Sequence, residues 1–304
     1  MELEIVKAVQ SMSNKFFDAF FWLITKMGEE TFFLFLLMMI YLCYDKFFAI
    51  KFSYFYLISV GFNSFIKLCV GRPRPHVASN QILNRLPADG YSFPSGHTQG
   101  FVVSATTGMI EINKRSKSNK LKISLLVTFI LLSILVMVSR LYWGQHYLSD
   151  VMVGLMLGLS IPFALEWLLR ILPNKFKSFF TIDKMFAILG ILSGILFVVL
   201  LSLELALGFS SSKAYKFVAI FLAMTIGYFI DKKWIHYIAN QGFVLGLTKF
   251  VISIVFVVGL YLLIDWVFVI RGWLYFVIYL FLGLVCTIIL PLIYKNIFKK
   301  VNHE

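Results

Sequence analysis

Residues 121–142 read LKISLLVTFILLSILVMVSRLY, and only Lys122 and Arg140 among them carry a charge. An apolar run of about 20 residues is long enough for an α-helix to cross the hydrocarbon core of a bilayer. Similar runs recur along the 304-residue chain, which is 60% hydrophobic and 14% charged. A soluble domain has about 25% charged residues. The composition therefore predicts a multi-pass membrane protein and excludes soluble, disordered and disulfide-rich secreted classes.

The apolar runs predict an all-α, polytopic fold with about nine transmembrane helices. Residues 1–28 alternate aromatic and charged residues, a pattern typical of an amphipathic segment at the membrane surface. We therefore expect three parts: this interfacial segment, a helical core over 29–172, and a C-terminal four-helix membrane extension over 173–304. The predicted spans lie at about 29–44, 52–70, 97–113, 121–142, 146–171, 185–208, 213–230, 247–269 and 272–295.

Basic residues in short loops predict the orientation, because cytoplasmic loops are enriched in Lys and Arg. The basic clusters all fall on one side of a nine-span chain, which places the C-terminus in the cytoplasm. The net charge of +13 is thus attributed to topology, and no nucleic-acid partner is expected. The clusters are Lys46 and Lys51, Lys114 to Lys122, Lys175 to Lys184, Lys232 and Lys233, and Lys295 to Lys300.

Three separate segments place polar residues at the opposite, outer face. Lys67 and Arg74-Pro75 follow the second predicted span, and Pro94-Ser95-Gly96-His97 opens the third. Ser139-Arg140, His146 and Asp150 lie at the turn between the fourth and the fifth. An ionisable residue inside a membrane segment is costly and by default marks a functional site. We therefore expect the three segments to form one site.

The cations and the helix start of this set predict binding of a phosphoryl group. Lys67, Arg74 and Arg140 would form a positive cluster that an anion must neutralise. A guanidinium matches phosphate oxygens as a bidentate fork, and an ammonium acts as a point charge. Ser95 and Gly96 begin a helix, where free backbone N–H groups favour an anion.

The remaining residues predict the reaction. His146 and Asp150 lie at i and i+4, so the carboxylate can fix the imidazole tautomer and leave the other nitrogen free to attack phosphorus. His97, from another span, can donate a proton to the leaving oxygen and later take one from water. The predicted route is a phosphohistidine on His146, followed by hydrolysis. Neither a metal nor another cofactor is expected, because three cations fill the electrophilic role.

The three segments resemble the signature of the type 2 phosphatidic acid phosphatase (PAP2) superfamily, which also contains vanadium haloperoxidases and glucose-6-phosphatases. The resemblance covers about residues 29–171. It implies a PAP2-type helical core in which His146 is the nucleophile, His97 the acid/base and Asp150 the orienting carboxylate. The chain looks like bacterial lipid phosphatases and sphingosine-1-phosphate phosphatases, and its span count is similar to glucose-6-phosphatase. The matching positions, in order, are Lys67, Arg74, Pro75, Pro94, Ser95, Gly96, His97, Ser139, Arg140, His146 and Asp150.

The expected function is hydrolysis of a lipid phosphate monoester at the extracytoplasmic face of the plasma membrane, with the bilayer and the lipid substrate as partners. Other functions stay open: hydrolysis of a polyprenyl (undecaprenyl) diphosphate or a sugar phosphate, lipid phosphotransfer, and, in a different class, a transporter or scaffold with a vestigial site. The chain has no Asn-x-Ser/Thr sequon, which favours a bacterial plasma membrane over an ER membrane. The sequence indicates no oligomeric state.

Several flanking residues have competing interpretations. Ser139 is expected either to bind phosphate or to cap its turn. Loop 76–93 is expected to cap the phosphate pocket or to hold a headgroup. Each polar flanking residue, taken singly, is expected to be solvated. The flanking aromatic residues either face the substrate or join the interfacial belt, and the belt is favoured. The polar residues are Arg72, His76, Arg85, Asp89 and Gln99, and the aromatic ones are Tyr91, Tyr142 and Trp143. Farther along the chain, Glu166 and Arg170 lie at i and i+4 and are expected to form a structural pair.

Overall fold

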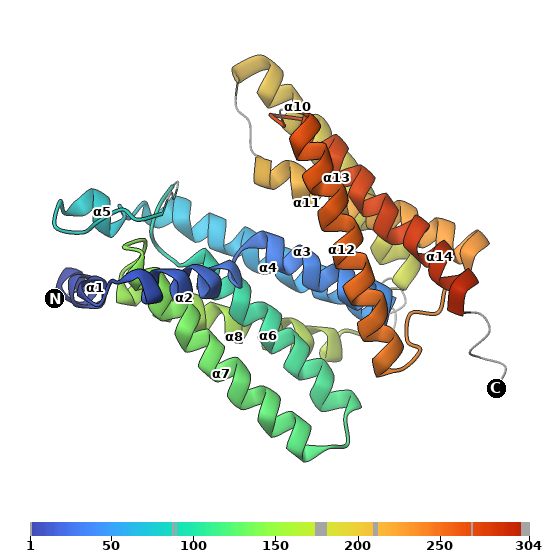
Figure 1. Cartoon of the computed structure of the whole chain (residues 1–304), viewed down its shortest axis with the longest axis horizontal. Coiled ribbons are helices and arrows are strands. Elements are labelled where there is room, and N and C mark those ends of the chain that lie inside the picture. Colours follow the sequence, from blue (N-terminus) through green and yellow to red (C-terminus); the bar gives the residue numbers. More distant parts are fainter. Residues whose placement is uncertain are drawn as a thin grey trace. The chain divides into compact units, whose positions relative to one another are not determined.

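All secondary structure in the described part of the chain is helical. The computed structural model describes residues 2–86, 88, 90–173, 181–208, 212–268 and 270–298 (Figure 1). The chain divides into two compact units. The first unit comprises Met1–Phe33 and Phe52–Leu172, and the second comprises Leu34–Lys51 and Pro173–Glu304. Residues 34–51 thus group with the C-terminal part of the chain.

The first unit contains the helices that carry the predicted site. Its N-terminal helices α1 and α2 each pack on the membrane-length helix α7, and α6 packs on both α7 and α8. The helices are α1 (Glu2–Ser11), α2 (Lys15–Lys26), α4 (Lys46–Val70, from Phe52 onward), α5 (Pro75–Ala78), α6 (Gly96–Arg115), α7 (Asn119–Tyr142) and α8 (Leu148–Ile171).

The second unit is built mainly of long apolar helices, of which α11 packs on α10 and α13. Three π-helical segments interrupt or extend these helices. The elements are α3 (Glu30–Met39, from Leu34 onward), η1 (Ile40–Tyr44), α10 (Ile182–Leu207), α11 (Ser212–Ile230), η2 (Asp231–Ile235), α12 (Phe243–Val267), α13 (Leu274–Leu284), η3 (Val285–Ile289) and α14 (Leu290–Ile297).

Two glycines bring α8 close to the start of α6. A Cβ atom at Gly154 would lie 2.8 Å from the Ser95 carbonyl oxygen, and one at Gly158 would lie 2.6 Å from the Cβ of Val102. Small residues four positions apart let two membrane helices approach closely. At the same place, the Ser95 backbone N–H donates a hydrogen bond of 3.0 Å to the Asp150 carbonyl. Two of the predicted polar segments are thereby joined.

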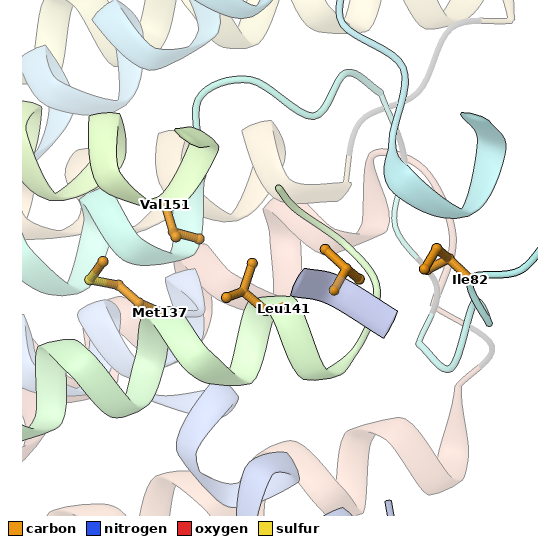
Figure 2. Packing of buried hydrophobic residues seen from close by; sticks show 5 residues of the cluster. Ile82, Met137, Leu141 and Val151 are labelled. Atoms are coloured by element: carbon orange, nitrogen blue, oxygen red, sulfur yellow. The ribbon is translucent and has the colours of Figure 1, made fainter. Parts of the chain in front are cut away.

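The N-terminal segment, predicted to be amphipathic, forms two helices that pack on α7. Val6 of α1 is fully buried and belongs to a hydrophobic cluster with Ile82, Met137, Leu141 and Val151. Figure 2 shows side chains of α7, α8 and the loop after α5 meeting in this cluster. Burying such side chains stabilises the contact by about 1.5–3 kcal/mol each, so α1 is an integral part of the first unit.

The chain is a multi-pass membrane protein with seven helices long and apolar enough to cross a bilayer among the residues searched. The expectation of about nine spans is thus met in part. The predicted span at 29–44 forms a shorter apolar stretch, Glu30–Tyr44. The span at 97–113 forms α6, which buries polar side chains such as Gln99, Thr107 and Glu111. The basic residues Lys175, Lys177, Lys299 and Lys300, used to predict orientation, lie outside the described residues.

Candidate active site

The polar segments predicted to converge lie at helix ends in the first unit. Lys67 is in the last turn of α4, and Arg74 directly precedes α5. Arg140 is in the last turn of α7, and Asp150 is in the first turn of α8. Helix N-termini leave backbone N–H donors, and helix C-termini leave carbonyl acceptors, without intrahelical partners, so these charged side chains lie beside backbone groups that other residues or a ligand must satisfy.

His146 is delivered by the turn between α7 and α8. Gly144 makes the turn with a φ of 68°, a left-handed conformation that glycine adopts without steric cost. The next residue, Gln145, is fully buried and donates its side-chain amide to Asn84 Oδ1 at 3.1 Å and to the Leu86 carbonyl at 2.5 Å. The loop before the site therefore fixes the turn that carries His146.

Asp150 lies behind His146. The Nδ1 atom of His146 is 3.5 Å from Oδ2 of Asp150, and the two side chains are 3% and 0% exposed. Asp150 also accepts hydrogen bonds from the Tyr147 backbone N–H at 2.9 Å and from the Ser92 hydroxyl. A carboxylate on Nδ1 favours the tautomer in which Nδ1 carries the proton and Nε2 is free.

Arg74 lies on the other side of the imidazole. Its Nη1 atom is 3.5 Å from Nε2 of His146, the nitrogen that faces away from Asp150. The guanidinium is held by hydrogen bonds from Nε to the Gly90 carbonyl at 3.0 Å and from Nη1 to the Gln145 carbonyl at 3.1 Å. A fixed guanidinium beside the free nitrogen is suited to hold an oxyanion next to an attacking atom.

Arg140 and Lys67 complete the positive cluster. Arg140 is 4% exposed, donates from Nη1 to the Thr25 hydroxyl at 2.6 Å, and has a buried Nε with no partner among the described residues. Lys67 donates to the backbone carbonyls of Tyr91 at 2.8 Å and Ser92 at 3.3 Å. A buried guanidinium with a donor left over is costly unless an anion completes it.

The Ser95-Gly96-His97 segment begins α6. The Ser95 hydroxyl is fully buried and accepts hydrogen bonds from the Thr98 backbone N–H at 3.4 Å and the Thr98 hydroxyl at 3.0 Å. Ser95 is thus the N-cap of the helix. Gly96 and His97 are its first two residues and are partly exposed. A Cβ at Gly28 would lie 2.8 Å from the Cβ of His97, so only glycine fits beside it.

The environment of His146 keeps its imidazole neutral. Burial, aided by the positive charges of Arg140, Arg74 and Lys67 and opposed by the hydrogen bond to Asp150, lowers the pKa of His146 to about 3. At neutral pH the Nε2 lone pair is therefore unprotonated. The same three cations that lower this pKa would stabilise a bound anion.

Residues 48–177 match the family model described as the PAP2 superfamily. This part of the chain belongs to the PAP2 superfamily. A probable sphingosine-1-phosphate phosphatase of Dictyostelium discoideum is 28% identical to the chain over 175 residues. That match covers 56% of this chain and 43% of the relative, so the chain spans less than half the length of the curated relative.

Two solved structures resemble part of the chain. One is a transmembrane PAP2 type phosphatidylglycerolphosphate phosphatase from Bacillus subtilis, with a TM-score of 0.48, 22% identity, and coverage of 55% of this chain and 83% of that chain. The other is LpxE of Aquifex aeolicus, with a TM-score of 0.46, 21% identity, and coverage of 54% and 93% respectively.

The sequence missed one ionic residue of the PAP2 core. Arg72, expected to be a solvated loop residue, donates from Nη1 to Oδ1 of Asp150 at 2.9 Å and from Nη2 to Oε2 of Glu2 at 2.6 Å. Its position two residues before Arg74, in the predicted outer loop that also contains Arg85, is the signal that could have indicated it.

A second group of polar residues in the PAP2 core is buried rather than solvated. Gln99 is 1% exposed, donates to the Ser59 hydroxyl at 2.8 Å and accepts from the Asn63 side chain at 2.7 Å. Ser139 is fully buried and donates to the Val136 carbonyl at 2.6 Å. The expectation that Gln99 is solvated was wrong, because its helix packs inside the unit, and Ser139 bonds within its own turn.

The loop before Pro94 is held by the N-terminal helices. Gln10 of α1 donates to the Leu83 carbonyl at 2.9 Å and accepts from the Leu83 N–H at 3.1 Å. Arg85 forms an ion pair of 2.9 Å with Asp18 of α2. His76 lies 3.2 Å from the Gly144 carbonyl through Nδ1, and Asp89 lies outside the described residues.

Two of the predicted belt aromatics are internal. Tyr142 is fully buried and its ring centroid lies 4.6 Å from that of Phe21, while Trp143 donates from its indole to the Phe21 carbonyl at 3.3 Å. The belt interpretation of these two was wrong, because α2 covers the end of α7. Tyr91 is 44% exposed.

Two further observations concern ions. Glu166, predicted to pair within its helix, forms an ion pair with Lys114 of α6. Within the residues searched, no group of three or more His, Cys, Asp or Glu side chains is arranged to hold a metal ion.

Proposed function

We propose that the chain is an integral membrane phosphatase that hydrolyses a lipid phosphate monoester through a phosphohistidine on His146. The observation that carries the proposal is the position of this imidazole between Asp150, 3.5 Å from Nδ1, and Arg74, 3.5 Å from Nε2. One side orients and supports the ring, and the other offers a donor for the group that Nε2 attacks.

The chemistry follows from these roles. Nε2 of His146 forms a bond to phosphorus while the bond from phosphorus to the lipid oxygen breaks, and His97 donates a proton to that oxygen. A water molecule then loses a proton to His97 and its oxygen attacks phosphorus, which breaks the N–P bond. The products are the lipid alcohol and inorganic phosphate.

Charge stabilisation in this reaction is assigned to the cluster around the imidazole. Arg74, Arg140 and Lys67, with the backbone N–H groups of Gly96 and His97 at the start of α6, would bind the equatorial phosphoryl oxygens. The unpartnered Nε of Arg140 supports this role, because a phosphate oxygen would supply the acceptor that the described protein groups do not. Ser95 contributes by capping the helix whose N–H groups face the anion.

We also propose the orientation that the basic loops predict. The site then lies at the extracytoplasmic end of the spans, the C-terminus is cytoplasmic, and the helices at 29–44 and 97–113 cross the membrane with the seven longer ones. A site at the end of membrane helices is reachable from the bilayer, which favours a lipid substrate. The name of the Dictyostelium relative makes a sphingoid base phosphate the first lipid to test.

The test is phosphate release by the purified full-length protein across a substrate panel. The panel contains phosphatidic acid, sphingosine-1-phosphate, phosphatidylglycerolphosphate, undecaprenyl diphosphate and glucose-6-phosphate, and adding a lipid alcohol detects phosphotransfer. We expect turnover of at least one lipid monoester and none with His146→Asn. His236→Asn, at an exposed histidine in the second unit, is the matched control and should retain wild-type turnover.

Two results would redirect the proposal. Preference for the diphosphate or the sugar phosphate would replace the lipid monoester as substrate while keeping the chemistry. Absence of phosphate release from every substrate, together with equal lipid uptake into vesicles by wild type and His146→Asn, would favour a transporter with a vestigial site.

A further inference from the structure

We infer that Glu2, at the start of α1, is a positioning residue for the proposed reaction: acting through Arg72, its carboxylate sets the orientation and the effective charge of Asp150 behind His146. The chemical consequence rests on the proposed function, whereas the contacts are a property of the resting protein.

Arg72 is the link between the two carboxylates. Its Nη1 donates to Oδ1 of Asp150 at 2.9 Å and to the Ser149 hydroxyl at 2.7 Å, while its Nη2 donates to Oε2 of Glu2 at 2.6 Å. The guanidinium carbon lies 3.7 Å from the centre of the Tyr147 ring. A planar guanidinium that is stacked and bonded at both ends has little freedom to move, so it transmits the position of one carboxylate to the other.

Glu2 is also bound directly to the helix that carries Asp150. Its Oε1 accepts a hydrogen bond of 2.9 Å from the Ser149 backbone N–H, in the first turn of α8. That N–H has no partner within its own helix, and a negative charge is favourable at a helix N-terminus. Burial acts to raise the pKa of Glu2, but the hydrogen bonds from Ser149 and Arg72 outweigh it and lower the pKa. Glu2 is therefore ionised at neutral pH.

The charge balance explains why a second carboxylate is useful. Asp150 divides its two oxygens between His146, through Oδ2, and Arg72, through Oδ1. Paired with Arg72 alone, Asp150 would have its charge cancelled. Because Glu2 shares Arg72, the three groups together are net negative. Attack by neutral imidazole on phosphorus makes the ring positive while Nδ1–H still faces Asp150, so a net negative group stabilises the phosphohistidine more than the ground state.

Helix α1 is anchored well enough to hold Glu2 in place. Val6, one turn along the helix, is fully buried in the cluster of Figure 2, and Gln10 is 8% exposed and bonded to Leu83 in both directions. Glu4 lies on the same helix but is exposed. Glu4→Gln therefore removes the same charge from α1 without touching Arg72, which makes it the matched control.

The experiment compares Glu2→Gln and Glu4→Gln in the full-length protein, using the best lipid phosphate of the panel. Glu2→Gln should lower kcat and the rate of phosphohistidine formation by about tenfold, with KM within about twofold of wild type because Glu2 does not touch the substrate. Glu4→Gln should match wild type in both constants. Glu2→Asp keeps the charge on a shorter stem and should recover part of the loss.

A spectroscopic measurement on resting protein separates positioning from folding. In protein labelled with ¹⁵N-histidine, the low-field resonance of the His146 Nδ1–H should move upfield in Glu2→Gln and stay in place in Glu4→Gln. The resonance is assigned by its absence in His146→Asn. If the folded fraction of Glu2→Gln has the wild-type kcat and the wild-type resonance, the role of Glu2 is overturned, whatever its thermal stability.

The two proposals fail in different ways. A wild-type protein that releases phosphate from no substrate contradicts the proposed function, and the Nδ1–H resonance still decides whether Glu2 acts on His146. An active wild type with an unaffected Glu2→Gln contradicts the role of Glu2 alone.

Discussion

Both units of the chain bury charged side chains, but the groups that compensate these charges differ between the units. In the first unit, Arg74 and Arg140 lie around a neutral histidine, and the nearby Asp150 is already bonded to Arg72. In the second unit, Asp231 pairs with Lys46, and fully buried Lys249 is held by the Gln241 side chain and the Ala239 carbonyl, with its ammonium over the Tyr237 ring.

This difference in charge compensation distinguishes a ligand-binding site from a purely structural ion pair. Removing a charge from water is costly unless a partner compensates it. In the second unit these partners come from the protein, so the named charges need nothing further. Around His146 the cations exceed the available carboxylate charge, and Arg140 keeps a buried donor without a partner among the described residues. The first unit therefore has the charge pattern of a site that an anion completes.

The largest effect is expected from removing a cation of the first unit. Arg74→Gln deletes the donor beside Nε2 and should lower kcat by about 10²–10³-fold, the size seen when one oxyanion donor is lost. Lys46→Gln, the control from the second unit, should leave kcat within about twofold of wild type. Steady-state kinetics on folded protein tests both. Comparable losses of kcat in the two variants would break the comparison between the units.

Breaking the pair in the second unit should change stability instead of turnover. Asp231→Asn leaves Lys46, whose side chain is 16% exposed, without its carboxylate and should lower the free energy of unfolding by about 3 kcal/mol. Denaturation in detergent, followed by circular dichroism, measures the change. The folded variant should keep the wild-type kcat and KM, and a selective loss of kcat would assign the second unit a part in the reaction.

The close approach of α6 and α8 gives a smaller effect. A Cβ at Gly154 would lie 2.8 Å from the Ser95 carbonyl, so Gly154→Ala should push the two helices apart, cost about 2 kcal/mol of stability, and lower kcat. Gly108→Ala, in α6 with open space around its Cβ, is the control and should be neutral or stabilising by up to about 1 kcal/mol. Equal stability of the two variants would contradict the packing role of Gly154.

The pH dependence of His146 ionisation and of protein stability tests the electrostatic environment assigned to the first unit. Because the pKa of His146 is lowered to about 3, its imidazole resonances should not titrate between pH 5 and 8 in the resting protein. Unfolded histidine has a pKa of about 6.5, so the unfolded state binds the extra proton between pH 6.5 and 3. Stability should therefore fall as pH falls through this range, by at most about 1.4 kcal/mol per pH unit. His146→Asn should reduce that slope, and a His146 resonance that titrates near pH 6.5 would contradict the buried, cation-rich site.

The sequence predicted the parts of the site that local spacing determines. His146 lies in the turn directly before α8 and Asp150 lies in the first turn of that helix, so four residues of spacing already bring them close, and Ser95 directly precedes a helix start. The contacts made by Thr25, Glu2 and Ser92 could not be predicted in this way. Each depends on how α2, α1 or a loop folds onto α7 and α8, and side chains far apart in sequence show no periodicity that relates them.

The fold was predictable to a similar extent. Hydropathy located the long apolar helices, because composition over about 20 residues is a strong signal. It described α6 less well, since the residues there include Gln99, Thr107 and Glu111, which are buried by protein. It also gave no indication that residues 34–51 group with the C-terminal helices, because that grouping is a property of tertiary packing.

Trapping the covalent intermediate tests the central claim most directly. The full-length protein is mixed briefly with a substrate labelled with ³²P in the phosphate, quenched in alkaline detergent to preserve phosphohistidine, and digested for mass spectrometry. We expect label on the peptide that contains His146, and none after His146→Asn. Label on a different residue, or normal phosphate release by the folded His146→Asn protein, would contradict the account.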